Sequence, residues 1–109
     1  MKAINFKGKK LLLVQSYYVY GGPALGLMEV GKTEIPYCVL SVNVPAPIKT
    51  KVGNFFIKNY SENEEIYKFL IEHGYLEETG HSIESGFVTI PECVLTDKAK
   101  EILLKEEEQ

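Results

Sequence analysis

The sequence predicts an α+β protein: an antiparallel sheet of about five short strands with one capped central helix and a C-terminal helix. Up to residue 57, short apolar segments alternate with turns that contain Gly or Pro, which favours an antiparallel meander. After residue 60, apolar residues recur at helical spacing. Because 45% of the 109 residues are hydrophobic, we expect a single domain over residues 1–109 with its own core. A frayed acidic tail is expected at 105–109.

Five segments of the first half have the composition and alternation of strands. They are residues 3–6, 10–19, 24–30, 35–44 and 54–57. The first two flank the turn signal Lys7-Gly8-Lys9 and therefore predict a β-hairpin or two successive strands. In the fourth segment, Cys38, Leu40, Val42 and Val44 alternate with Ser41 and the other odd-numbered residues. The apolar side of this strand should lie on the core.

The central helix is predicted by a start signal, an apolar stripe and a stop signal. Ser61-Glu62-Asn63-Glu64 fits a capping box, in which the serine and the second glutamate bond each other's backbone N–H groups. Ile66, Phe69, Leu70 and His73 then follow at helical spacing. Gly74 stands where a left-handed C-terminal cap is expected.

The last third of the chain predicts a loop, a strand and a second helix. Residues 79–82 have loop composition, and residues 86–90 a strand that Pro91 should end because proline lacks an N–H group. Thr96-Asp97 should cap a final helix. Its apolar side contains Ala99, Ile102 and Leu103.

Composition limits the kinds of binding partner and the cellular location that we expect. The net charge is −3 and every cationic side chain except histidine is Lys, which argues against nucleic acid, since phosphate binding needs a surplus of cations. The first ten residues lack the apolar core of a signal peptide, and the longest apolar run, residues 11–14, is far too short to span a membrane. We expect a cytoplasmic protein, with Cys38 and Cys93 reduced and at least partly buried.

Motifs for catalysis, cofactors and metals are missing from the sequence. The two cysteines and two histidines, His73 and His81, have no zinc-type spacing, so we expect neither a metal nor a cofactor. A nucleophilic site could be assembled from His81, Ser82, Glu84 and Ser85. Turn chemistry explains these residues better, and we therefore expect a protein that is not an enzyme.

The most suggestive candidate site is an aromatic strand beside glycines. Tyr17, Tyr18 and Tyr20 offer flat amphipathic rings, and Gly21-Gly22 lets a ligand or a partner backbone approach closely. The alternative is that these tyrosines only fill the surface of a sheet. Lys9, Lys10 and His81 complete the candidate set, because lysines that converge on the aromatic strand could hold a phosphate.

Several short motifs carry a resemblance to a known family. They are Ser16-Tyr17-Tyr18 with Gly21-Gly22, then Leu40-Ser41-Val42-Asn43-Val44-Pro45, then Ile57-Lys58-Asn59-Tyr60-Ser61-Glu62-Asn63, and then Thr79-Gly80 with Ser85-Gly86-Phe87 and Pro91. In this order the chain resembles a family of small uncharacterised bacterial and phage proteins, a domain of unknown function found in mobile genetic elements. The resemblance implies a stoichiometric binding role in such an element and transfers no catalytic residue.

The leading hypothesis is a non-enzymatic phage or mobile-element protein that counters host defence by capturing a host protein. The tyrosines would anchor the partner, while Glu62, Glu64, Glu65 and the acidic residues 106–108 steer a basic one. The alternative is a sponge that sequesters a nucleotide-like small molecule, and a small hydrolase comes third. An exposed strand edge would also allow a homodimer.

Overall fold

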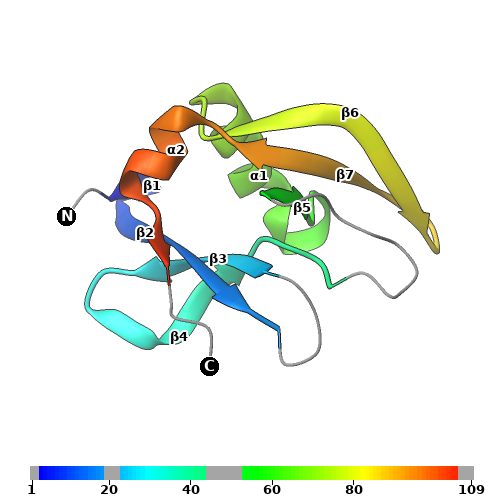
Figure 1. The fold of residues 1–109 in the computed structure, drawn as a ribbon. Coiled ribbons are helices and arrows are strands. Elements are labelled where there is room, and N and C mark those ends of the chain that lie inside the picture. Colours follow the sequence, from blue (N-terminus) through cyan, green and yellow to red (C-terminus); the bar gives the residue numbers. More distant parts are fainter. Residues whose placement is uncertain (1–2, 19–22, 44–52, 106–109) are drawn as a thin grey trace.

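The computed structural model describes residues 3–18, 23–43 and 53–105, and for 33–35 the backbone alone. It contains two sheets, antiparallel except for the short strand β8, and two helices, which confirms the predicted α+β class (Figure 1). The first sheet consists of β1 (Ile4–Phe6), β2 (Lys9–Tyr17), β3 (Pro23–Glu29) and β4 (Lys32–Val39) in this order, with β8 (Leu104–Lys105) added to β2. The second has the order β5 (Asn54–Phe56), β7 (Val88–Leu95), β6 (Leu76–Ser85).

The first two strands form the predicted hairpin. Lys7 and Gly8 have φ angles of 49° and 78°, the two positive values that a type I′ turn requires, and Ile4 pairs with Leu11. Beyond β1, the free edge of β2 is occupied by β8, which runs parallel to it. Lys105 therefore belongs to a strand opposite Gln15 and not to a frayed tail, whereas residues 106–109 lie outside the described residues.

The two sheets are joined where β4 ends. The Leu40 N–H donates to the Leu25 carbonyl in β3 (2.9 Å), while the Leu40 carbonyl accepts from Lys58 (2.7 Å), just after β5. Leu40 is fully buried, as predicted, and Ser41, which alternates with the apolar side, is also only 6% exposed. Ser41 forms an isolated β-bridge with Ile57 at this junction, so segments of both sheets surround it. Val44 lies outside the described residues.

Strands β6 and β7 contradict two predictions for the second half of the chain. Residues 79–82, expected to form a loop, lie inside β6, and Pro91 lies inside β7 and does not end it. The register shifts between Glu78 and Ser82, and Pro91 pairs with Ser82 at the end of this irregular stretch. Proline is tolerated there because the backbone groups of Pro91 face away from β6, towards Ile57 just beyond the end of β5, so the β6–β7 ladder does not need its missing N–H. Its carbonyl still accepts the Ile57 N–H (2.9 Å).

The turn between β6 and β7 is also displaced from its prediction. Gly86 and Phe87, expected at the start of a strand, connect Ser85 to Val88 as a two-residue turn. Gly86 has φ of 61°, and a first residue with positive φ is what the type II′ hairpin turn demands.

The central helix begins differently from the predicted capping box. A 3₁₀ turn, η1 (Ser61–Asn63), precedes α1 (Glu64–Glu72), and neither start has a side-chain cap. Ser61 has φ of 54°, outside the extended conformation that an N-cap serine uses, so the box does not form. Instead, the buried Asn63 side chain donates to the Val39 carbonyl (2.7 Å) and ties the helix start to the end of β4.

The end of α1 confirms the predicted glycine cap. Gly74 has φ of 75°, and its N–H donates to the Ile71 carbonyl (3.2 Å). The Tyr75 N–H donates to the Leu70 carbonyl (2.8 Å). These two bonds form a Schellman motif, which the left-handed glycine makes possible.

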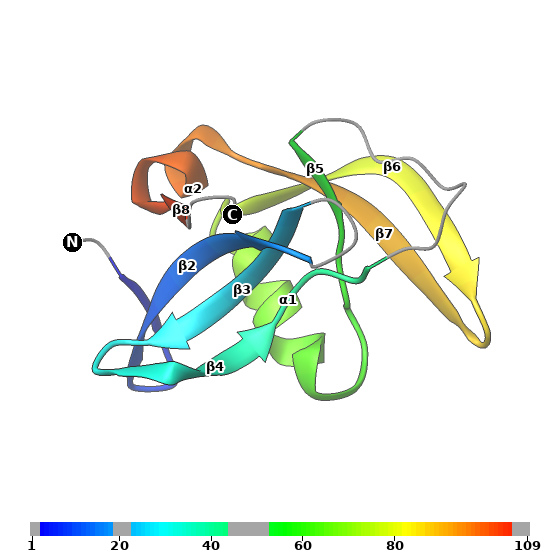
Figure 2. The same ribbon diagram turned by 60° about the horizontal axis from the view of Figure 1, so that its bottom comes forward.

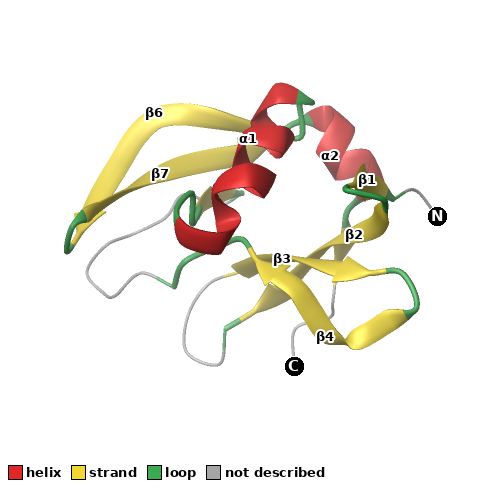
Figure 3. Ribbon diagram, turned by 180° about the vertical axis from the view of Figure 1, so that it is seen from behind, coloured by secondary structure: helices red, strands yellow, loops and turns green. Residues whose placement is uncertain are grey.

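A single core connects both sheets and both helices. Helix α1 lies beside the two sheets (Figure 3) and buries Ile66, Tyr67 and Leu70. They pack in a cluster with buried residues of the first sheet (Ile4, Phe6, Leu11, Leu13, Leu25, Leu27), of the second sheet (Phe55, Leu76, Cys93, Leu95), and with Leu40, Ile57 and Ala99. The predicted helical stripe is thus largely buried, although His73 at its end is exposed and stacks on Phe69.

Helix α2 (Asp97–Ile102) begins at Thr96, as predicted. The Thr96 hydroxyl accepts the Ala99 N–H (3.2 Å) and donates to the Gly74 carbonyl (2.5 Å). One hydroxyl therefore joins the start of α2 to the end of α1.

Replacing Thr96 by Val should lower the free energy of unfolding by about 1 kcal/mol, because the shape is kept while the cap is lost. The matched variant Thr96→Ser keeps the hydroxyl and should retain most of the stability. Urea unfolding of the three proteins, compared by their midpoints, measures the difference. Equal midpoints for the Val variant and the wild type would show that this hydroxyl contributes nothing.

Candidate functional site

Tyr17 and Tyr18 of the aromatic strand lie in different environments. Tyr17 is 40% exposed at the end of β2. The Tyr18 hydroxyl is instead hydrogen-bonded to the Ser41 hydroxyl (2.8 Å), at the junction of the two sheets. Tyr20, Gly21 and Gly22 lie outside the described residues. Among the described tyrosines of this strand, Tyr17 is therefore the more accessible to a partner.

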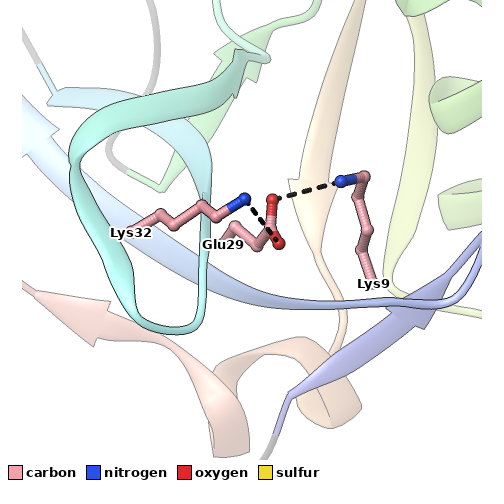
Figure 4. Close-up of polar contacts among 3 residues, drawn as sticks. All are labelled: Lys9, Glu29 and Lys32. Atoms are coloured by element: carbon pink, nitrogen blue, oxygen red, sulfur yellow. Dashed lines mark hydrogen bonds and ion pairs between the residues drawn. The ribbon is translucent and has the colours of Figure 1, made fainter.

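The predicted basic cluster is partly neutralised within the chain. Glu29 lies between two lysines (Figure 4), with the Lys9 Nζ 3.4 Å from one carboxylate oxygen and the Lys32 Nζ 3.8 Å from the other. Lys10 is exposed. Lys9 and Tyr17 stand at opposite ends of β2, about 26 Å apart at the usual rise of a strand. The lysines and tyrosines of this strand therefore do not converge on one ligand.

The two cysteines are free, and their partial or full burial confirms the prediction. Burial raises the pKa of each thiol to about 11. The Tyr67 hydroxyl lies 3.6 Å from the Cys93 sulfur, and burial also raises the pKa of Tyr67. Both thiols are protonated at neutral pH and so are poor nucleophiles. Within the described ranges, no three His, Cys, Asp or Glu side chains are grouped as metal ligands.

A cleft of about 260 Å³ opens between β1, β4 and α1. It is lined by Phe6, Lys7, Tyr37, Cys38, Glu62, Glu65 and Ile66. Pockets for drug-sized ligands usually measure about 300–1,000 Å³, so this cleft is small for a nucleotide. Its charges also pair: Lys7 with Glu65, a hydrogen bond that raises the pKa of Lys7, and Glu62 with Lys58.

The acidic residues expected to steer a partner are paired in the same way. Glu62 lies 2.6 Å from the Lys58 Nζ, and this bond lowers the pKa of Glu62. Glu64 lies 3.6 Å from the Lys68 Nζ, and Glu65 contacts Lys7. Residues 106–108 lie outside the described residues. These three carboxylates are therefore neutralised by lysines and offer little net attraction for a basic partner.

The most distinctive exposed feature is the β6–β7 arm, residues 76–95. Figures 1 and 2 show that this hairpin extends away from the rest of the chain towards its turn. Phe87 stands at that turn and is fully exposed, unlike any other described large apolar side chain, the next being Val39 at 50%. His81, a predicted site residue, lies on β6 and is exposed. Ser82, Glu84 and Ser85 of the imagined nucleophilic site lie on the same exposed strand.

Negative charge is concentrated on this arm. It contains four Glu and no Lys. Because the whole chain has a net charge of −3 and the arm supplies −4, the remaining residues together carry +1. Glu77, Glu78 and Glu84 are exposed, while Glu92 is 7% exposed and accepts a hydrogen bond from the Thr79 hydroxyl (2.8 Å). The arm therefore combines an exposed aromatic ring with an acidic surface.

Sequence reasoning missed this arm because β6 has little apolar alternation. Its residues include Glu, Thr, Gly, His and Ser, which are typical of loops, and β7 supplies the buried partners. One available signal was the dipeptide Ser85-Gly86, a turn marker placed between Ile83 and Val88. Had this turn been recognised, Phe87 would have been predicted at a hairpin tip.

Within the described part of the chain, each helix is too short or too polar to traverse a lipid bilayer. Comparisons of the chain with protein-family models, with curated proteins and with solved structures found no match.

Proposed function

We propose that this chain is a non-enzymatic protein that captures a protein partner through the β6–β7 arm, with Phe87 as the anchor. The observation that carries the proposal is the complete exposure of Phe87 at the end of an acidic hairpin. Large aromatic side chains are among the residues that contribute most to protein interfaces when they enter a pocket of the partner. In water the same ring remains hydrated, so burying it would favour complex formation.

The charge of the arm supports a basic partner. Glu77, Glu78 and Glu84 lie on the same exposed strand, and the arm contains no Lys to offset them. Charges at the rim of an interface mainly accelerate encounter with an oppositely charged surface. The arm would therefore attract a basic surface first and then bind it through the aromatic ring.

The resemblance to proteins of mobile elements extends the proposal to its setting. We place the activity in the cytoplasm of a bacterial host, where a phage or mobile element would use it to block a host protein, including one of a defence system. The nucleotide-sponge alternative has less support, because Lys9 is paired with Glu29 and the Tyr18 hydroxyl with Ser41.

The test is partner capture by the wild type and by Phe87→Ser. Immobilised protein is incubated with a bacterial lysate, and bound proteins are identified by mass spectrometry. Loss of the ring should weaken binding of a specific partner by at least about 2 kcal/mol, or about 30-fold, as for an interface anchor. Val30→Ser is the matched control, because Val30 is an apolar residue that is 44% exposed in the turn between β3 and β4.

The expected result is a partner retained by the wild type and by Val30→Ser but lost by Phe87→Ser. Because Phe87 makes little contact with the fold, its variant should melt within about 2 °C of the wild type, as for a neutral surface substitution. A partner that both variants retain equally would contradict the role of the arm.

A further inference from the structure

The outer edge of β6 has backbone groups without a strand beside them. Within the described ranges, β6 pairs with β7 on one side and is the terminal strand of its sheet on the other. The turn has two residues, so Ser85 and Val88 form a hydrogen-bonded pair, and bonded and non-bonded pairs then alternate along the ladder. The backbone groups of Ile83 and Ser85 therefore point towards β7, whereas those of Ser82 and Glu84 point towards the open side.

The charged side chains of this edge that are fully ionised at neutral pH are all negative. Edge strands are commonly protected from pairing by charged residues, above all lysine. On β6 the charged residues are Glu77, Glu78 and Glu84, all exposed and all negative. Such an edge repels acidic strands and leaves the hydrogen-bonding groups available to a basic one.

A second copy of the chain fits this edge poorly. Two β6 strands can pair antiparallel only in registers that set their outward-facing residues opposite each other. The register that pairs residues 77–85 of both copies sets Glu78 of one copy directly opposite Glu84 of the other, twice per dimer. Like charges directly opposite each other destabilise a strand pair. Charge thus selects a different occupant.

We infer that β6 adds a Lys- or Arg-rich extended segment of a partner protein as an antiparallel strand. Main-chain hydrogen bonds to Ser82 and Glu84 would supply affinity, and basic side chains opposite Glu77, Glu78 and Glu84 would supply selectivity. This inference rests on the proposed function and identifies the partner class: the arm provides a template edge along β6 and an anchor at Phe87.

The test uses a synthetic peptide of the length of β6 with alternating Lys and Thr. Amide hydrogen exchange of the ¹⁵N-labelled protein is measured by NMR with and without an excess of this peptide. Pairing should slow exchange of the outward amides of Ser82 and Glu84 by at least about tenfold, since a protected amide exchanges only on opening. The amides of Ile83 and Ser85, already bonded to β7, should change little.

Two controls separate strand pairing from simple attraction of charges. A peptide of alternating Glu and Thr should leave exchange unchanged. Ser82→Pro removes an outward N–H without altering charge or the β7 ladder, and should weaken binding of the Lys-Thr peptide by at least about fivefold. Glu84→Lys, a second variant, should weaken it by at least about twofold through charge alone.

The inference is overturned if the Lys-Thr peptide fails to bind, or if it binds without slowing exchange at Ser82 and Glu84. Protection of these amides that rises with protein concentration alone would identify a second copy as the occupant and would also overturn it. None of these outcomes depends on Phe87. Partner capture lost in Phe87→Ser together with a negative peptide result would leave the proposed function standing and remove only the strand-addition mode.

Discussion

Replacing Leu70 by Ala is expected to lower the free energy of unfolding by about 2–5 kcal/mol, the usual cost of truncating a fully buried leucine. Leu70 is 0% exposed on α1 and belongs to the cluster that includes residues of both sheets. Alanine favours the helix, so the loss comes from the apolar contacts and the cavity, not from helix propensity. Domains of this kind are stable by about 5–15 kcal/mol in total, so the loss expected from this one side chain is a large fraction of the total free energy of unfolding.

Lys68→Ala is the matched control on the same helix. Lys68 is exposed and lies 3.6 Å from Glu64, an exposed ion pair whose loss should cost at most about 0.5 kcal/mol. Thermal unfolding followed by circular dichroism should show a melting temperature lower by at least about 10 °C for Leu70→Ala. A difference below about 2 °C would mean that α1 is not packed against the two sheets.

The β1–β2 hairpin, the end of α1 and the start of α2 could be predicted because local signals agree with the tertiary structure. The glycine at position 8 lies in the turn that the β1–β2 hairpin needs, and its φ is positive. Gly74 ends α1 for the same reason, and Thr96 starts α2 with its hydroxyl. Each of these residues acts on neighbours within a few positions, so its role is readable from the sequence.

Long-range contacts explain what could not be predicted. The strand β6 is held by its ladder to β7, and its own residues have low strand propensity. Ser61 fits a capping box, yet the start of α1 is positioned by the Asn63 side chain at the carbonyl of Val39, 24 residues earlier. The sequence pattern does not predict that contact.

The candidate site in the structure differs from the predicted one for a related reason. Tyr17 and Tyr18 have chemistry suited to binding, but in the structure the hydroxyl of Tyr18 is hydrogen-bonded to Ser41. Phe87 is a single aromatic residue without a motif, and only the turn that exposes it makes it a candidate. Exposure depends on tertiary structure and is therefore the property that sequence predicts least well.

Replacing Ser41 by Ala is expected to lower the free energy of unfolding by about 2–3 kcal/mol, because a buried donor is left without a partner. The Ser41 hydroxyl accepts the Leu25 N–H (2.8 Å) and is bonded to the Tyr18 hydroxyl (2.8 Å). Beyond Val39 the chain leaves β4, and this hydroxyl takes the place of the carbonyl that a continuing strand would offer to Leu25. Alanine cannot replace it.

Tyr18→Phe is the control that divides this effect into its two hydrogen bonds. Tyr18 is half-buried, so removing its hydroxyl leaves Ser41 bonded to Leu25 and should cost at most about 1 kcal/mol. The double variant should then lose less than the sum of the single losses, since both changes remove the same bond. Urea unfolding of the four proteins measures the coupling. If Ser41→Ala costs no more than Tyr18→Phe, the bond to Leu25 is dispensable and the two sheets are joined by backbone contacts alone.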